Sequence, residues 1–354
     1  MSLNDKSILW PGVPYALGAA ALFGVTTPFS KFLLGSISPW LLAGILYLAA
    51  GLGLLGLRLL RRVLKRQSAE VNLAVRDFPW LAAVIIFGGI IGPVLLMFGL
   101  FRTTAGSASL LLNLEGLATM VIAWVVFREN VDRRLLAGAL AILCGAMLLA
   151  WDGTGISLDL GALLIAGACL AWGIDNNLTR KLSGADPVQI AMIKGIFAGS
   201  TNLGLAVYLG AEMPPIPGVA MAGIVGLFGI GISLVMFMLA LRHLGAARTG
   251  AYFSLAPFIG AVIAIALLSE PVTWQLVLAA LLMMLGTWLH VTERHEHEHT
   301  HAEQEHDHIH VHDEHHNHAH ETPVVEPHSH LHRHKPIRHK HPHYPDLHHR
   351  HEHS

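Results

Sequence analysis

Histidines at every second position form the most chemically specific pattern in the sequence. Of its 25 histidines, 23 follow residue 292, and most alternate with other residues, among them Asp, Glu, Arg and Pro. An extended chain places residues two apart on one side, about 6 to 7 Å from each other along the backbone. Neutral imidazole binds Zn²⁺, Ni²⁺, Co²⁺ and Cu²⁺. We therefore expect divalent metal to bind this tail, at His295, His297, His299, His301, His306, His308, His310, His312, His328, His330, His332 and His334.

Residues 292–354 are predicted to be a disordered cytoplasmic tail. Prolines and charged residues interrupt the histidines, and apolar residues are too scarce for a packed core. A flexible chain can then fold several imidazoles around one ion. Whether that metal is cargo, a signal or only buffered is left open by the sequence, and the rest of the chain requires no cofactor.

Glu115 is the candidate proton-coupling or substrate group. It lies in the middle of an apolar run, with Asn113 and Thr119 about one helical turn away and no basic residue within reach on its own helix. An ionised carboxylate at the bilayer centre costs roughly 2.5 to 3.5 kcal/mol on insertion scales, so such groups are usually functional. The alternative is a neutral glutamic acid that ties two helices together by a hydrogen bond.

Asp175 and Lys194 are a second pair of ionisable residues inside apolar segments. A short loop joins the two predicted helices that carry them, so the two groups are expected at similar depth and in contact. Such a pair either takes part in transport or only fixes helix register, and the structural role is the better supported of the two. Asn176 adds polar surface to the same region.

Thr26 and Thr27 are expected at the middle of the first predicted helix. Pro28 follows at once and removes one backbone donor, which predicts a break in that helix. Broken helices near the bilayer midplane tend to line binding sites, so both threonines are candidate substrate contacts.

The segments that position these residues are membrane spans. The chain is 53% hydrophobic and 13% charged, with a mean hydropathy of +0.52, which is too apolar for a soluble domain. A helix needs about 20 apolar residues to cross the bilayer. Ten segments qualify and predict an all-α membrane protein, at 13–35, 39–60, 80–101, 105–127, 135–151, 160–179, 188–210, 219–241, 247–268 and 273–291.

The distribution of basic residues predicts the orientation. With the N-terminus (residues 1–12) in the cytoplasm, fourteen Lys and Arg residues fall on the cytoplasmic side and two, Lys31 and Arg102, near the outer face. Both termini are therefore expected inside, in an inner (plasma) membrane. The net charge of −1 and the lack of a basic face argue against nucleic acid as a partner. The membrane part has no catalytic triad or phosphate-binding loop, so an enzyme is not expected.

An internal repeat divides the membrane part into residues 13–151 and residues 160–291, here called the first and second halves. Five spans per half is an odd number, so the second half is expected upside down relative to the first, as in many secondary transporters. The alternative is chance similarity among Gly- and Leu-rich helices. The matched residues, at separations of 139 to 149, are Gly24 with Gly173, Lys31 with Arg180, Pro39 with Pro187, Met97 with Met236, Glu129 with Glu270 and Gly145 with Gly286.

The ends of the two halves resemble the EamA-type transporters of the drug/metabolite transporter superfamily. Each half has a Glu-x-Val sequence, Glu129-Asn130-Val131 or Glu270-Pro271-Val272, followed by a Gly-containing last helix. The resemblance covers about residues 13 to 291. It implies a ten-helix exporter of amino acids or other small metabolites, usually driven by the proton gradient. The first half departs from the family pattern at Leu114-Glu115-Gly116, where the second half has Ala256-Pro257.

Three functions remain open at this point. The leading prediction is a proton-coupled exporter of a small solute by alternating access, with a metal-chelating tail. The alternative is an efflux transporter of Ni²⁺, Co²⁺ or Zn²⁺, although the predicted spans offer few midplane ligands for such ions. The third is a metal-sensing membrane scaffold. The expected partners are the lipid bilayer, the solute and divalent metal ions, and either a monomer or a homodimer is compatible with the sequence.

Overall fold

The computed structural model describes residues 12–64, 73, 75–127, 133–151, 159–182, 185–292, 296–301, 304–310, 328–334 and 337–342. Contacts divide the chain into a membrane unit, Met1–Glu293, and a tail unit, Arg294–Ser354. The described helices all belong to the membrane unit, and the described strands are paired within the tail unit.

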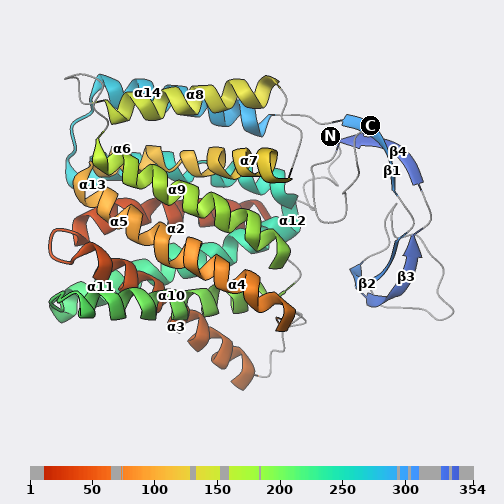
Figure 1. Cartoon of the computed structure of the whole chain (residues 1–354), viewed down its shortest axis with the longest axis horizontal. Helices are drawn as coiled ribbons and strands as arrows, with labels where there is room; N and C mark the ends of the chain where they lie inside the picture. The colour runs from red at the N-terminus through yellow and green to blue at the C-terminus, as the bar shows by residue number, and fades with distance from the viewer. Residues whose placement is uncertain are drawn as a thin grey trace. The chain divides into compact units, whose positions relative to one another are not determined.

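The first half consists of helices that follow the predicted spans closely (Figure 1). Its third span combines three helical segments, and its fourth span is divided in two. The elements are α2 (Gly12–Leu33), α3 (Pro39–Val63), η1 (Val75–Asp77), α4 (Phe78–Val84), η2 (Ile85–Ile91), α5 (Gly92–Arg102), α6 (Ala105–Leu111), α7 (Leu114–Phe127) and α8 (Arg133–Ala150).

The second half repeats this order of helices. Its elements are α9 (Leu160–Thr179), η3 (Arg180–Leu182), α10 (Pro187–Tyr208), α11 (Ile216–Val225), η4 (Gly226–Ile232), α12 (Ser233–Phe253), α13 (Ala256–Leu268) and α14 (Trp274–Val291). The described residues hold nine segments that are long and apolar enough to cross a membrane. The remaining predicted span is α9, which forms as a helix of 20 residues but is less apolar because Asp175, Asn176 and Asn177 are adjacent in it.

Small residues allow helices of the two halves to pack closely. In the α3–α10 crossing, a β-carbon at Gly195 would lie 2.7 Å from the Cα of Gly51. In the α8–α14 crossing, a β-carbon at Gly138 would lie 2.8 Å from the carbonyl oxygen of Gly286. Figure 1 shows the α8–α14 pair along the top of the membrane unit and the α3–α10 pair along the bottom. Close approach of this kind is the usual basis of helix association in lipid.

Both halves depart from regular α-helix at equivalent places. The third span of each half contains a seven-residue π-helix, η2 in the first and η4 in the second, and these begin 141 residues apart (Ile85 to Gly226). Single π-turns are often found at functional sites. The fourth span is interrupted at Leu112–Asn113, and the equivalent interruption follows Phe253.

The predicted break at Pro28 is wrong. Helix α2 continues through Pro28 without interruption, because one missing donor is tolerated where the surrounding turns keep their hydrogen bonds. The hydroxyl of Thr26 donates to the carbonyl oxygen of Leu22, at 3.0 Å, one turn earlier in the same helix. In the first half the interruption lies instead in the fourth span, which carries Glu115.

The carboxylate of Glu270, in the second half, caps the N-terminus of α6 in the first half. Glu270 accepts hydrogen bonds from the backbone amides of Ala105 (2.6 Å) and Gly106 (2.8 Å), the first two residues of α6. The first amides of a helix have no partner within the helix, and a negative charge near them is favourable. Glu270 therefore stabilises the start of α6.

The tail unit contains four strands where the sequence analysis predicts disorder. They are β1 (Glu296–His301), β2 (Gln304–His310), β3 (His328–His334) and β4 (Ile337–Pro342), with β1 antiparallel to β4 and β2 antiparallel to β3. Alternation of residues with period two is typical of strands, which accounts for the difference. The predicted metal ligands His295 and His312 lie outside the described residues.

We expect Gly195→Ala to destabilise the membrane unit, because the added methyl group would overlap Gly51 and overpacking of this kind costs about 1 to 3 kcal/mol. Gly204→Ala in the same helix is the matched control, since a β-carbon there meets nothing within 4 Å. Thermal unfolding in detergent should show a lower Tm for Gly195→Ala and an unchanged or higher Tm for Gly204→Ala. Equal Tm values for the two variants would contradict the close crossing.

Candidate functional site

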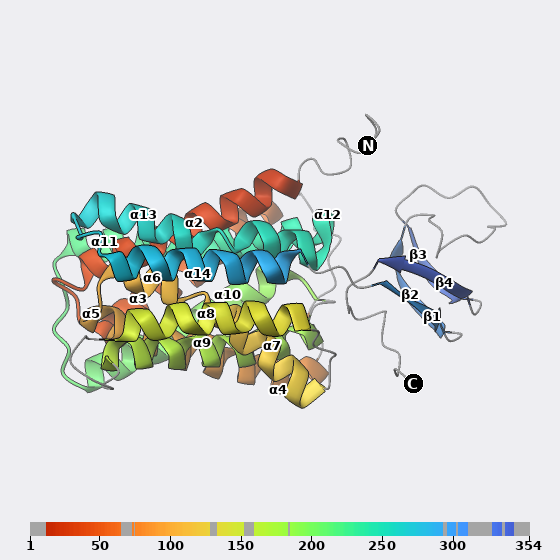
Figure 2. The ribbon, with the colours of Figure 1, turned by 90° about the horizontal axis from the view of Figure 1, so that it is seen from above.

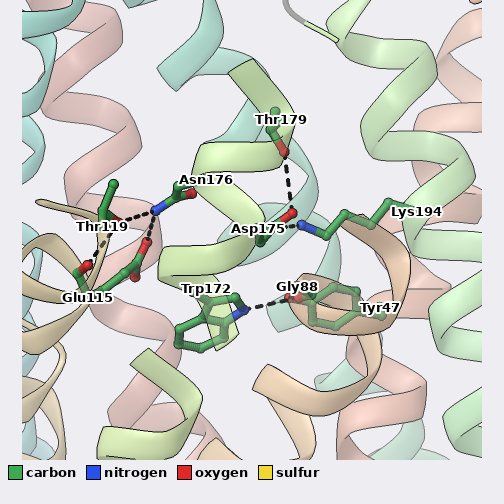
Figure 3. Close-up of polar contacts among 9 residues, drawn as sticks. All are labelled: Tyr47, Gly88, Glu115, Thr119, Trp172, Asp175, Asn176, Thr179 and Lys194. Atoms are coloured by element: carbon green, nitrogen blue, oxygen red, sulfur yellow. Dashed lines mark hydrogen bonds and ion pairs between the residues drawn. The ribbon is translucent and has the colours of Figure 1, made fainter. Parts of the chain in front are cut away.

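A backbone carbonyl of the first π-helix is at the centre of a polar network. The carbonyl oxygen of Gly88 in η2 accepts hydrogen bonds from the Tyr47 hydroxyl and from the Trp172 indole nitrogen, each at 3.0 Å. The side-chain amide of Asn202 donates to the next carbonyl, that of Gly89, at 3.1 Å. These three donors come from α3, α9 and α10. The π-helix of the first half is thus held by side chains of both halves (Figure 3).

An ion pair between Asp175 and Lys194 lies next to Gly88. The Lys194 ammonium donates to the Asp175 carboxylate, whose other oxygen accepts a hydrogen bond from Thr179 at 3.3 Å. The side chains of Asp175 and Lys194 are only 7% and 13% exposed. A β-carbon at position 88 would overlap both charged groups, so glycine is required for this close approach. Removal of one partner from such a buried pair is strongly destabilising, because the other charge stays buried without compensation.

Glu115 takes part in a second cluster, in the first turn of α7, directly after the interruption of the fourth span. Its carboxylate accepts a hydrogen bond from the Asn176 side chain at 2.9 Å, and the same amide lies 3.2 Å from the Thr119 hydroxyl. Thr119 in turn donates to the backbone carbonyl of Glu115 at 2.9 Å. The Asn177 side chain also donates to the backbone carbonyl of Thr119 at 3.1 Å, so two adjacent amide side chains of α9 join it to α7.

Helix α9 joins the two clusters. Figure 3 shows Trp172 and Asp175 directed toward Gly88 and Lys194, and Asn176 directed toward Glu115 and Thr119. Residues 175 and 176 are adjacent, so a small rotation of α9 about its axis would change both clusters together. Figure 2, turned by 90° from Figure 1, shows α9 alongside α7 within the bundle. Helix α9 therefore links the ion pair of the second half to the Glu115 cluster of the first half.

The predicted site residues divide into three groups in the structure. Asp175, Lys194, Asn176 and Glu115 belong to the network described above. Asn113 does not, because the interruption at Leu112 turns it toward α14, where it contacts Met283 and Thr287. Thr26 and Thr27 are 7% and 3% exposed and lie in α2, where Thr26 faces Gly229 of η4. Their roles in transport stay predictions.

Sequence reasoning did not identify Tyr47, Trp172 and Gly88. Aromatic residues in apolar spans are more often packing residues than parts of a site, so nothing marked Tyr47 and Trp172. The available signal was the consecutive pair Gly88-Gly89 in the middle of a span, since adjacent glycines permit close approach of neighbouring side chains. Within the described residues, the His, Cys, Asp and Glu side chains form no group of three or more that could hold a metal ion.

Comparison with known proteins places both halves of the chain in one family. Residues 10–151 and 159–292 each match the EamA-like transporter family. The chain is 28% identical over 295 residues to an uncharacterized transporter of Methanothermobacter thermautotrophicus, covering 79% of this chain and 86% of that protein. It is 23% identical over 286 residues to the uncharacterized transporter YyaM of Bacillus subtilis, covering 76% and 90%. A solved crystal structure shares the fold, with a TM-score of 0.58 at 17% identity over 78% of this chain and 95% of the solved chain.

We expect Tyr47→Phe to lower stability by about 1 kcal/mol or less, because the Trp172 indole still donates to the Gly88 carbonyl. In Trp172→Phe with Tyr47→Phe the carbonyl loses both donors, so the loss should exceed the sum of the two single losses. Thermal unfolding of the three variants in one detergent measures this. Additive changes in Tm would show that the two donors act independently of each other.

Proposed function

Because the chain belongs to the EamA-like transporter family, we propose that it is a secondary active transporter that exports a small polar solute in exchange for protons. One observation carries this proposal: a network of charged and amide side chains lies inside an apolar helical unit, at the contact between the two halves. Intramembrane ionisable groups are expensive to bury and are functional by default. The members of this family are transporters and not enzymes.

Alternating access explains how such a network transports a solute. The two halves are inverted repeats in this proposal, with the solute bound between them near the bilayer midplane. Rocking of one half against the other exposes the solute to each side in turn. The interruptions of the fourth and ninth spans and the two π-helices allow the bend that this motion requires. Both termini lie in the cytoplasm in this arrangement.

Glu115 is the proposed coupling group. Its carboxylate accepts from Asn176 when ionised, and protonation of that oxygen would make it a hydroxyl donor and weaken its acceptance from Asn176. Proton binding therefore changes the contact between α7 and α9. Because Asn176 adjoins Asp175, the same change is transmitted to the ion pair on the other face of α9.

A gradient-driven transport assay tests the coupling role. Full-length protein is first screened for solutes that raise its Tm, from amino acids, other small metabolites and divalent metal salts. In proteoliposomes, Glu115→Gln should then lose solute accumulation driven by a pH gradient, by about tenfold or more, and keep solute exchange without a gradient. Glu212→Gln, at an exposed loop carboxylate outside the network, should behave as the parent protein. Equal loss of driven transport and exchange would assign Glu115 a structural role.

Metal binding by the tail is a separate proposal, favoured by the pairing of its strands. Opposed residues of β1 and β4 include His297 with His341 and His299 with His339. Opposed residues of β2 and β3 include three further His pairs, at 306 with 332, 308 with 330 and 310 with 328. Directly opposed residues, and residues two apart, share one face of a ribbon. This register would gather histidines on one face of each ribbon for Zn²⁺, Ni²⁺, Co²⁺ or Cu²⁺.

Exchange of neighbouring residues tests the register without a change in composition. His299→Thr with Thr300→His moves one histidine to the other face of β1, and we expect about tenfold weaker Zn²⁺ binding, since prearranged ligands bind with a higher effective concentration. Asn317→His with His318→Asn, outside both ribbons, is the control. Titration of full-length protein with Zn²⁺ measures both. Identical affinities would show that the tail chelates metal without a fixed register.

Experiments in cells test whether the metal itself is the transported solute. Metal resistance and metal content are compared for the full chain, a chain ending at Glu293, and Glu115→Gln. If the metal is buffered, truncation alone should lower resistance. Loss of resistance in Glu115→Gln would instead favour a metal efflux transporter. A metal-sensing scaffold predicts that neither Glu115→Gln nor a pH gradient affects the movement of any solute.

A further inference from the structure

The two π-helices make equivalent contacts with opposite halves. Gly88 of η2 lies against Asp175 in α9, and Gly229 of η4 lies against Thr26 in α2. Gly88 and Gly229 are 141 residues apart, the same separation as the starts of the two π-helices. Asp175 and Thr26 are matched by the repeat, since each lies two residues after a matched glycine. The fold thus contains the same contact twice, once for each half.

The chemistry of the two contacts is different. At the first, the ion pair of Asp175 and Lys194 lies on η2, and side chains donate to the carbonyls of Gly88 and Gly89. At the second, the Thr26 hydroxyl is bonded within its own helix, and the described side chains place no donor on the carbonyls of η4. The repeat partner of Lys194 is Leu46 and that of Glu115 is Ala256. The ionisable groups of the network therefore have uncharged counterparts.

Opening these two contacts has unequal costs. Separation of η2 from α9 and α10 removes the Trp172 and Asn202 donors from the buried carbonyls of Gly88 and Gly89. The ion pair of Asp175 and Lys194 ties together α9 and α10, the two helices that carry these donors. Separation of η4 from α2 leaves the Thr26 hydrogen bond intact, because donor and acceptor both belong to α2. Mainly van der Waals contact is lost at that site. The uncharged contact is therefore the easier one to open.

We propose that Asp175 and Lys194 form a latch that holds the protein closed at the end of the bundle where the α9–α10 loop lies. Without solute, the protein is then open at the end where the α2–α3 loop lies, or this end is the first to open. This inference rests on the alternating access of the proposed function. Asp175 and Lys194 act as positioning residues in it, because their pair holds together α9 and α10, whose Trp172 and Asn202 bond to η2, and so sets which state is populated.

Two matched alanines serve as reporters of the two ends. Ala191 lies three residues before Lys194 in α10, and Ala43 lies three residues before Leu46 in α3, so the two alanines share helix faces with Lys194 and with its repeat partner. They are 5% and 0% exposed. Ala191→Cys or Ala43→Cys is introduced into full-length protein carrying Cys144→Ala and Cys169→Ala. The rate of reaction with a polar maleimide in detergent then measures access at each end.

The latch predicts slower labelling at position 191 than at position 43 in the parent protein. Asp175→Asn should raise the rate at position 191 by about tenfold or more and leave the rate at position 43 unchanged or lower. Gly88→Ala should act in the same direction, because its methyl group would overlap both charged groups. Thr26→Val and Gly229→Ala, at the uncharged contact, should leave the rate at position 191 unchanged or lower.

Two results would overturn the latch: faster labelling at 191 than at 43 in the parent protein, or a rise of equal size at both positions in Asp175→Asn. If Asp175→Asn does not fold, Asp175→Lys with Lys194→Asp keeps both charges. This variant should label slowly at position 191, and fast labelling there would count against the latch. The assay needs no solute, so a failure of solute transport with an intact labelling pattern would reject the proposed function and retain the latch.

Discussion

Backbone groups inside a membrane must find their hydrogen-bond partners within the protein, and the wide turn of η2 makes this requirement acute. The carbonyls of Gly88 and Gly89 receive their donors from side chains on three other helices. Each donor fixes one neighbouring helix against the third span. The same absence of side chains at Gly88 lets the ion pair of α9 and α10 come into contact with the backbone. The polar contacts around Gly88 and Gly89 follow from this one irregular segment.

Hydropathy was sufficient to predict the helices, because the length of an apolar run is set by the bilayer. The approach of Asp175 to Lys194 was also predictable, since a short loop leaves two adjacent helices little freedom in depth. The direction of Asn113 was not predictable, because it depends on how far the chain turns at the interruption that precedes α7. The π-helices depend on contacts between segments far apart in the sequence, as does the pairing of β1 with β4.

The two halves of the chain share a backbone plan and differ in polar chemistry. The third span of each half widens into a π-helix, and the fourth span of each half is interrupted. The ion pair of Asp175 and Lys194, however, belongs to the second half alone. A duplicated fold with identical halves would have two equally stable states. Substitution of a few side chains at matched positions is enough to favour one state, because removal of one member of a buried ion pair costs about 3 to 5 kcal/mol, against about 0.8 kcal/mol for a buried methylene group.

The contact of Glu270 with the start of α6 has a consequence for the order in which the protein matures. The donor and acceptor are separated by 165 residues, so most of the chain must be synthesised before the first amides of α6 meet their acceptor. Until then those amides depend on water at the surface of the membrane. The start of the fourth span is therefore completed only when the ninth has entered the bilayer, and a first half produced alone would lack this support.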